Sequence, residues 1–143
     1  MQITHDFDRS AALPVAWGIR VLVLSGDVDT PLQARIASLG GTVEVEGEVF
    51  SALAAILDDP MGYGLFVIDC DGLGGADVGR RAATTLVAER SRVPVILISG
   101  EHGSQVFPQE KNEPVQLRAP LSTVSLRVGF EHALRDRLIW RAA

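Results

Sequence analysis

The sequence has 143 residues, of which 47% are hydrophobic and 22% are charged, and this size and composition fit one globular domain with a single core. The net charge of −5, without a cluster of basic residues, argues against binding to nucleic acid, which needs several Lys or Arg contacts to phosphates. A single cysteine, Cys70, excludes a disulfide framework and a multi-cysteine zinc site. The apolar runs are too short to span a membrane and no signal peptide is evident, so a cytoplasmic protein without membrane contacts is predicted.

From residue 19 onward, short β-branched runs alternate with amphipathic segments, which is the pattern of βα units on a parallel sheet. The predicted strands are residues 20–24, 42–45, 65–68, 93–98 and 115–117. The runs LFVI and VPVILI are apolar throughout, as expected for strands that helices cover on both faces. Residues 1–18 are predicted to form an amino-terminal extension, and residues 19–143 the domain itself.

The first helix is predicted to begin with Thr30 as its cap and Pro31 in its first turn, and to end at Gly40. The second and third helices are predicted around residues 50–57 and 78–86, where apolar residues recur at helical spacing. Both are interpreted as packing helices.

The last helix is predicted to follow Ser122 as its cap and to continue toward the carboxyl terminus. Its apolar stripe consists of Leu126, Phe130, Leu134 and Leu138. Between the last two strands, residues 100–114 contain two prolines, a glycine and few apolar residues, so a loop or a broken helix is expected there.

Chemistry is expected at the carboxyl ends of the strands, because ligands of open α/β sheets bind there. The residues that follow the strands are Ser25, Gly26, Asp27, Asp69, Asp71, Ser99, Arg118, Ala119 and Pro120. Asp69 is the most informative of them, since a carboxylate that ends a buried strand is unfavourable unless hydrogen bonds, a cation or solvent compensate for its desolvation.

Four segments are similar in order and spacing to the receiver domains of two-component response regulators. They are IRVLVLSGD, GLFVIDCDGLGGADVGRRA, VPVILISG and LRAP, and the resemblance extends from residue 20 to about residue 138. It implies a flavodoxin-like, doubly wound α/β domain with five parallel strands in the order 2-1-3-4-5. Here the fourth helix is expected to be short or missing.

In that family an aspartate at the end of the third strand accepts a phosphoryl group from a histidine of a kinase. Acids after the first strand hold Mg²⁺, a Ser or Thr after the fourth strand contacts the phosphoryl oxygens, and a Lys before a Pro neutralises them. The resemblance therefore implies Asp69 as the candidate phosphoacceptor and Ser99 as the phosphoryl contact. Mg²⁺ is the one cofactor implied, with Asp27, Asp69 and Asp71 as the carboxylates present to bind it.

Two core parts of the family's site are missing from the sequence. Ser25 and Gly26 occupy the places of the acidic pair, and Ala119 occupies the place of the lysine. The only lysine in the chain, Lys111, lies in the proline-flanked loop. We therefore predict an atypical receiver with weak or no phosphorylation of Asp69. It is expected to act through contacts with a protein partner, either a sensor kinase or a downstream regulator. A homodimer is a further assembly that the sequence leaves open.

A second reading is an enzyme. VIDCDGL resembles the first motif of the haloacid dehalogenase superfamily of Mg²⁺-dependent phosphohydrolases, which would make Asp69 the nucleophile, Asp71 the general acid and base, and Ser99 the hydroxyl of the second motif. That chemistry also needs a lysine, for which Lys111 is the candidate, and a later acidic pair, whereas the acids after Ser99 are isolated. Two βα units precede the motif, which normally lies on the first strand, so this alternative ranks second and a non-enzyme is predicted.

Overall fold

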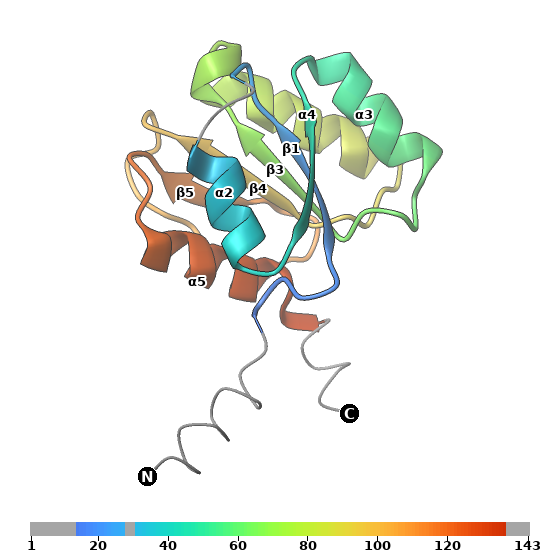
Figure 1. Cartoon of the computed structure of the whole chain (residues 1–143). Helices are drawn as coiled ribbons and strands as arrows, with labels where there is room; N and C mark the ends of the chain where they lie inside the picture. The colour runs from blue at the N-terminus through green and yellow to red at the C-terminus, as the bar shows by residue number, and fades with distance from the viewer. Residues whose placement is uncertain (1–13, 28–30, 137–143) are drawn as a thin grey trace, which may run out of the picture.

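The computed structural model describes residues 14–27 and 31–136, and it is a three-layer α/β sandwich around one parallel sheet (Figure 1). The strands are β1 (Arg20–Leu24), β2 (Thr42–Glu46), β3 (Leu65–Asp69), β4 (Val95–Ser99) and β5 (Val115–Arg118). The helices are α2 (Pro31–Ser38), α3 (Val49–Asp58), α4 (Ala76–Ala88) and α5 (Thr123–Ala133), with a 3-10 turn η1 (Asp71–Leu73). The five strands are parallel in the order β2-β1-β3-β4-β5, which confirms the predicted fold class.

The core lies in two layers, one on each face of the sheet. Because successive side chains of a strand point to opposite faces, alternate residues of β1, β3 and β4 belong to different layers. The layer under α2 and α5 includes Val21, Val23, Leu65, Val67, Ile96 and Ile98. The layer under α3 and α4 includes Leu22, Leu24, Phe66, Ile68 and Leu97. The continuous apolar runs of the sequence thus correspond to strands that are covered on both sides.

Strand β4 begins at Val95, two residues later than predicted. Pro94 has no N–H group to contribute to the ladder of hydrogen bonds, although its carbonyl accepts a bond of 2.9 Å from the N–H of Phe66. The β-branched pattern therefore starts earlier than the regular pairing does.

The helices follow the predicted signals where the structure describes them. The hydroxyl of Ser122 accepts a hydrogen bond of 3.0 Å from the N–H of Ser125, as expected for the cap of α5. The predicted cap Thr30 and the continuation of the last helix through Leu138 lie outside the described residues. None of the helices in the described ranges is long and apolar enough to cross a membrane.

Between β4 and β5 the described chain forms no helix, which confirms the expectation for residues 100–114. Val106 instead pairs antiparallel with Gln116 of β5 through two backbone hydrogen bonds, each 2.9 Å long. The segment therefore runs back along the edge of the sheet and does not cover its face.

Three polar contacts tie this segment to the end of α5. His132 donates from Nε2 to the carbonyl of Pro108 at 2.5 Å, and Arg135 donates to the carbonyl of Gln109 at 2.9 Å. Lys111 forms an ion pair of 2.9 Å with Asp136. The segment is thus held on the α5 side of the domain, which leaves the neighbouring flank of α4 without a covering helix.

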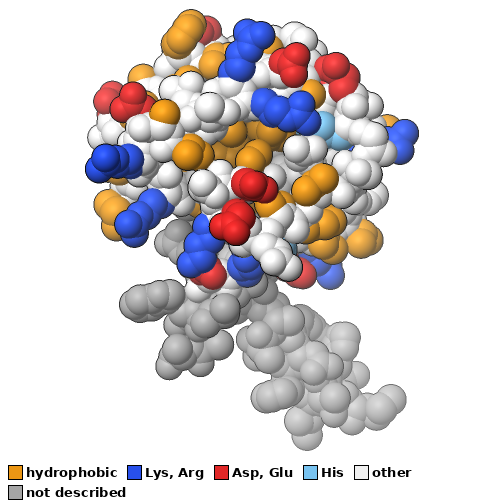
Figure 2. Space-filling view, turned by 180° about the vertical axis from the view of Figure 1, so that it is seen from behind, with side chains coloured by type: hydrophobic (Ala, Val, Ile, Leu, Met, Phe, Trp, Pro, Cys, Tyr) orange, Lys and Arg blue, Asp and Glu red, His pale blue; other side chains and the backbone are white. Residues whose placement is uncertain are grey.

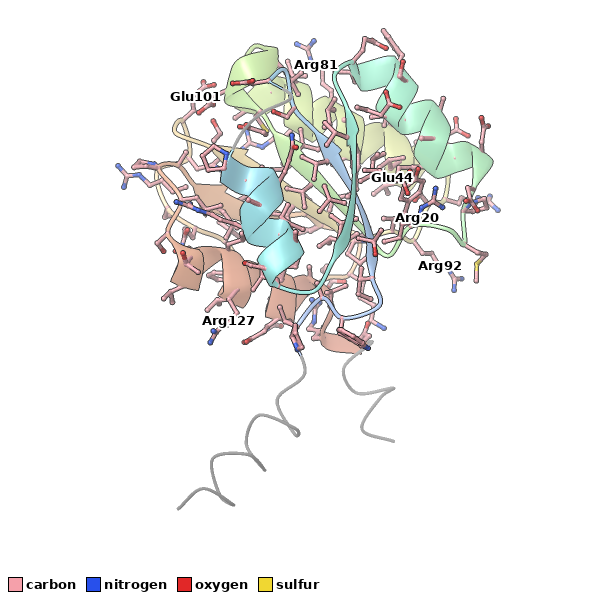
Figure 3. The ribbon with its side chains drawn as sticks, in the orientation of Figure 1. Arg20, Glu44, Arg81, Arg92, Glu101 and Arg127 are labelled. Carbon is pink, nitrogen blue, oxygen red and sulfur yellow. The ribbon has the colours of Figure 1, made fainter. Side chains whose placement is uncertain are left out.

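The amino ends of β1 and β2 are joined by a cluster of polar side chains around Arg20. Arg20 forms an ion pair with Glu44, beside which it lies in Figure 3, and a second one of 3.0 Å with Asp59. Its guanidinium also lies 4.1 Å from the centroid of the Tyr63 ring. The hydrogen bond from Arg20 lowers the pKa of Glu44 below its ordinary value. This cluster holds the end of the sheet that lies opposite the carboxyl ends of the strands.

Candidate functional site

Asp69 lies half-buried at the carboxyl end of the central strand β3, where the buried run LFVI holds it in place. The hydroxyl of Ser25, at the end of β1, lies 3.4 Å from Oδ2 of Asp69. The same hydroxyl lies 3.0 Å from the carbonyl of Asp27 and accepts the N–H of Asp27. Since a hydroxyl has one proton to donate, it is shared between the Asp69 carboxylate and the loop after β1.

The pKa of Asp69 is raised above the ordinary value of an aspartate. Burial is the main cause, and the charges of Asp71 and Asp27 raise the pKa further, whereas the hydrogen bond from Ser25 opposes the shift. The ionised carboxylate is therefore less favourable in the folded protein than in the unfolded chain.

Asp69→Asn is expected to stabilise the protein at neutral pH. The folded state holds the Asp69 proton to a higher pH than the unfolded state, so stability falls as the pH rises from about 4, the ordinary value for aspartate, through the raised pKa. Asparagine carries no charge and escapes this loss. Urea unfolding should show Asp69→Asn more stable than the parent at neutral pH, with the difference closing toward pH 4. A variant that is less stable at neutral pH would contradict the direction of the shift.

Asp71 joins η1 to the end of β4. Its Oδ1 accepts the hydroxyl of Ser99 at 2.5 Å, and its Oδ2 accepts the N–H of Gly100 at 2.8 Å. Ser99 also accepts the N–H of Glu101 at 3.0 Å. Ser99 lies two positions after Leu97, whose side chain belongs to the layer under α4, and on this face its hydroxyl meets Asp71. The structure therefore brings the predicted residues together at one edge, but in a different pairing.

Two glycines face each other across the mouth of the site. Gly26 follows β1, and a Cβ atom added to it would lie 2.6 Å from the carbonyl oxygen of Gly72 and 3.3 Å from the carbonyl carbon. The first distance is shorter than a Cβ atom tolerates, and the contact is with backbone. At the position where the resemblance calls for an acid, the loop after β3 thus occupies the space that a side chain would need.

The positive charge of a receiver site is not supplied by Ala119, Arg118 or Lys111. Ala119 lies at the family's lysine position, and its N–H donates to the carbonyl of Ser99 at 3.2 Å. Arg118 is exposed, and its N–H lies 3.3 Å from the side-chain oxygen of Gln105. Lys111 lines a cavity with Arg92 before β4, at the end of the sheet opposite Ser99. Figure 3 shows this separation, with Glu101 and Arg92 at opposite ends of the strands.

The residues present supply only part of a receiver-type magnesium site. Magnesium binds an octahedron of oxygen ligands, yet both carboxylate oxygens of Asp71 accept hydrogen bonds and Gly26 offers no carboxylate. Of the predicted carboxylate ligands, this leaves Asp27 and Asp69. Within residues 14–27 and 31–136, no group of three or more His, Cys, Asp or Glu side chains could hold a metal ion.

Two residues of this edge were not identified from the sequence. Glu101 accepts the N–H of Ala76 at 2.9 Å through its Oε1, and so caps α4 from the loop after β4. His102 is buried, and its Nδ1 lies 2.9 Å from the carbonyl of Leu117, while its Nε2 has no hydrogen-bond partner among the described residues. Neither contact has a local sequence signal, because each joins residues that are at least 15 positions apart.

No protein-family model matches the chain, and no curated protein sequence matches it significantly. Solved structures do resemble it. A response regulator receiver domain protein of Clostridium thermocellum superposes with a TM-score of 0.62 at 16% identity, over 85% of this chain and 98% of the other.

Two further similar structures contain magnesium. The receiver domain of a sensor histidine kinase from Pseudomonas aeruginosa, with a magnesium ion in its active-site cleft, has a TM-score of 0.59 at 19% identity, over 82% of this chain and 98% of the other. The receiver domain of a histidine kinase from Arabidopsis thaliana, complexed with Mg²⁺, has a TM-score of 0.53 at 16% identity, over 81% and 93%. These likenesses show that the chain has the fold of receiver domains.

Proposed function

We propose that this chain, which has the receiver fold, is an atypical receiver domain of two-component-type signalling that acts through protein contacts, with weak or no phosphorylation of Asp69. The observation that carries the proposal is the approach of the Gly72 carbonyl to Gly26, at 2.6 Å from the position of a Cβ atom. An acid at this position would collide with backbone, so the second carboxylate of a receiver-type magnesium site has no room. Ala119, in place of a lysine, removes the positive charge as well.

The chemistry of phosphoryl transfer supports this reading. The transferred group carries negative charge that a metal ion and a cation must stabilise, and catalysis depends almost entirely on that stabilisation and on positioning. At this site Asp69 is accompanied by the carboxylates of Asp71 and Asp27, which raise its pKa. A phosphoryl group on Asp69 would meet further negative charge, and Ser99 is already engaged with Asp71.

Sensor kinases and downstream regulators are the partners we propose, with a homodimer as a further assembly. The exposed face of α5 supports a protein interface, since Val124 and Val128 lie four residues apart on it and are 71% and 40% exposed. We do not propose nucleic acid as a partner, because the net charge of −5 would repel its phosphates.

Incubation with Mg²⁺ and acetyl phosphate tests the proposal directly. We expect intact-mass spectrometry to show the unmodified protein under conditions that label an ordinary receiver domain run in parallel. The Asp69→Asn variant is the control for labelling elsewhere in the chain. Stoichiometric addition of one phosphoryl group that disappears in Asp69→Asn would overturn the proposal.

The phosphohydrolase alternative is not retained as a proposal. Asp69, Asp71 and Ser99 do converge, but Lys111 pairs with Asp136 and lies at the other end of the sheet. The same preparation separates the two readings. Hydrolysis of p-nitrophenyl phosphate with Mg²⁺, abolished by Asp69→Asn and by Asp71→Asn, would favour the enzyme over the receiver.

A further inference from the structure

An apolar groove runs along the flank of α4 that the segment before β5 leaves uncovered. Two neighbouring cavities of about 380 and 340 Å³ form it, and they share Ala83, Val87, Asn112, Glu113 and Pro114. Figure 2 shows a hollow on this side of the molecule, with hydrophobic side chains at its floor and basic and acidic side chains at its rim. A third cavity, of about 370 Å³, continues it past Arg92 and Val93 toward the amino ends of the strands.

The walls of the groove come from elements that are held apart. One wall is α4, with Leu86 at the floor and Val87, which is 40% exposed, at the edge. The other wall is the segment 111–114, which the Lys111–Asp136 ion pair ties to α5. Since that segment is held on the α5 side, the apolar surface between the walls stays open.

The last described residue lies at the rim of the groove. Asp136 lines both the 380 Å³ cavity and the cavity that continues it, and the chain proceeds from there as Arg137, Leu138, Ile139, Trp140 and Arg141. Three consecutive large apolar residues thus follow a residue that already borders an apolar groove. Seven residues span up to about 24 Å when extended, so the segment 137–143 can reach along the groove without any movement of α5.

We propose that residues 137–143 dock in this groove, with Leu138, Ile139 and Trp140 against the apolar flank of α4. Removal of these side chains and of the groove from water drives the contact. The segment begins at the rim, so its local concentration at the groove is high and little affinity is needed for occupancy.

Charged side chains of both signs line the groove, namely the acids Glu113 and Asp136 and the bases Arg80, Arg92 and Lys111. Glu113 is exposed, and no ion pair involves it in the part of the chain that the structure describes. It is therefore available to pair with Arg137 or Arg141, the two arginines that flank the apolar residues of the segment. A charge pair at an exposed rim fixes the position of the segment more than it adds to its affinity.

Quenching of Trp140 fluorescence by acrylamide tests the docking in the full chain. Trp17→Phe leaves Trp140 as the only indole, because the chain has two tryptophans. In this background Val87→Glu places a charge in the groove. Phe50→Glu is the control, since Phe50 is an exposed apolar residue of helix α3 and lines none of the three cavities.

We expect Trp140 to be protected from acrylamide in the background and in Phe50→Glu. Val87→Glu should lower the ratio of docked to free segment by about tenfold, which corresponds to about 1.4 kcal/mol. Trp140 that is quenched in the background like a free indole would overturn the proposal. Protection of Trp140 that survives Val87→Glu would also overturn it, because the segment would then lie outside the groove. So would protection that is present in Trp17→Phe but lost in Trp17→Ala, because the segment would then pack against residue 17. Protection that disappears on dilution would assign the groove to a second copy of the chain.

Discussion

Phe66→Ala is expected to lower the free energy of unfolding by about 3–5 kcal/mol, the range for removal of a buried aromatic side chain. Phe66 is completely buried on the central strand β3 and pairs with Leu22 of β1 and Val95 of β4. Its ring belongs to the layer under α3 and α4, so alanine would leave a cavity between the sheet and both helices. A domain of this size is stable by only about 5–15 kcal/mol, and the loss is a large part of that.

Chemical denaturation of the parent, Phe66→Ala and Phe50→Ala measures this effect. Phe50 lies in the first turn of α3 and is 78% exposed, so its replacement should change the stability by no more than about 0.5 kcal/mol. Equal losses in the two variants would mean that α3 packs through a different face from the one described.

The fold could be predicted from the sequence because its signals are local. The apolar runs LFVI and VPVILI mark strands that are covered on both faces, and both lie in the interior of the sheet. The cap Ser122 and the prolines of residues 100–114 likewise act within a few residues of themselves. The strand order came from the resemblance to receiver domains, and the structure confirms it.

The site could be predicted only as a set of residues. Which side chains pair with one another depends on the turn after β3, where Gly74 and Gly75 adopt φ values of +119° and +117° that favour glycine. This turn leads the chain into α4 behind Asp71, whose carboxylate meets Ser99 of β4. The approach of Gly72 to Gly26 joins two loops 46 positions apart, and no spacing in the sequence indicates it.

The single lysine gains meaning from its position. At most positions arginine can take the place of lysine, so the scarcity of lysine says nothing about function there. It matters at Ala119, where the receiver resemblance calls for a lysine. Lys111 pairs with Asp136 at the end of the sheet away from Asp69, so it cannot replace the lysine that receiver chemistry uses. No lysine therefore lies beside Asp69, because the single lysine of the chain is paired with Asp136.

Restoring the missing acid is expected to disrupt the site and not to repair it. Gly26→Asp should lower the free energy of unfolding by about 1–3 kcal/mol, because its Cβ atom must displace the backbone carbonyl of Gly72. Gly103→Asp is the matched control, since a Cβ atom at Gly103 would have no neighbour within 4 Å, and its cost should stay within about 0.5 kcal/mol. Urea unfolding of the two variants compares the costs.

The double variant Gly26→Asp/Ala119→Lys separates the two reasons for the proposed loss of phosphorylation. It supplies both residue types that the receiver resemblance calls for, yet the Gly72 carbonyl still occupies the space of the new acid and Asp71 still holds Ser99. We therefore expect no stoichiometric labelling with Mg²⁺ and acetyl phosphate in the double variant. The opposite result would be labelling of the double variant that depends on Mg²⁺ and is lost when Asp69→Asn is added. It would show that the loop after β3 can move aside, and that Gly26 and Ala119 alone account for the loss of phosphorylation.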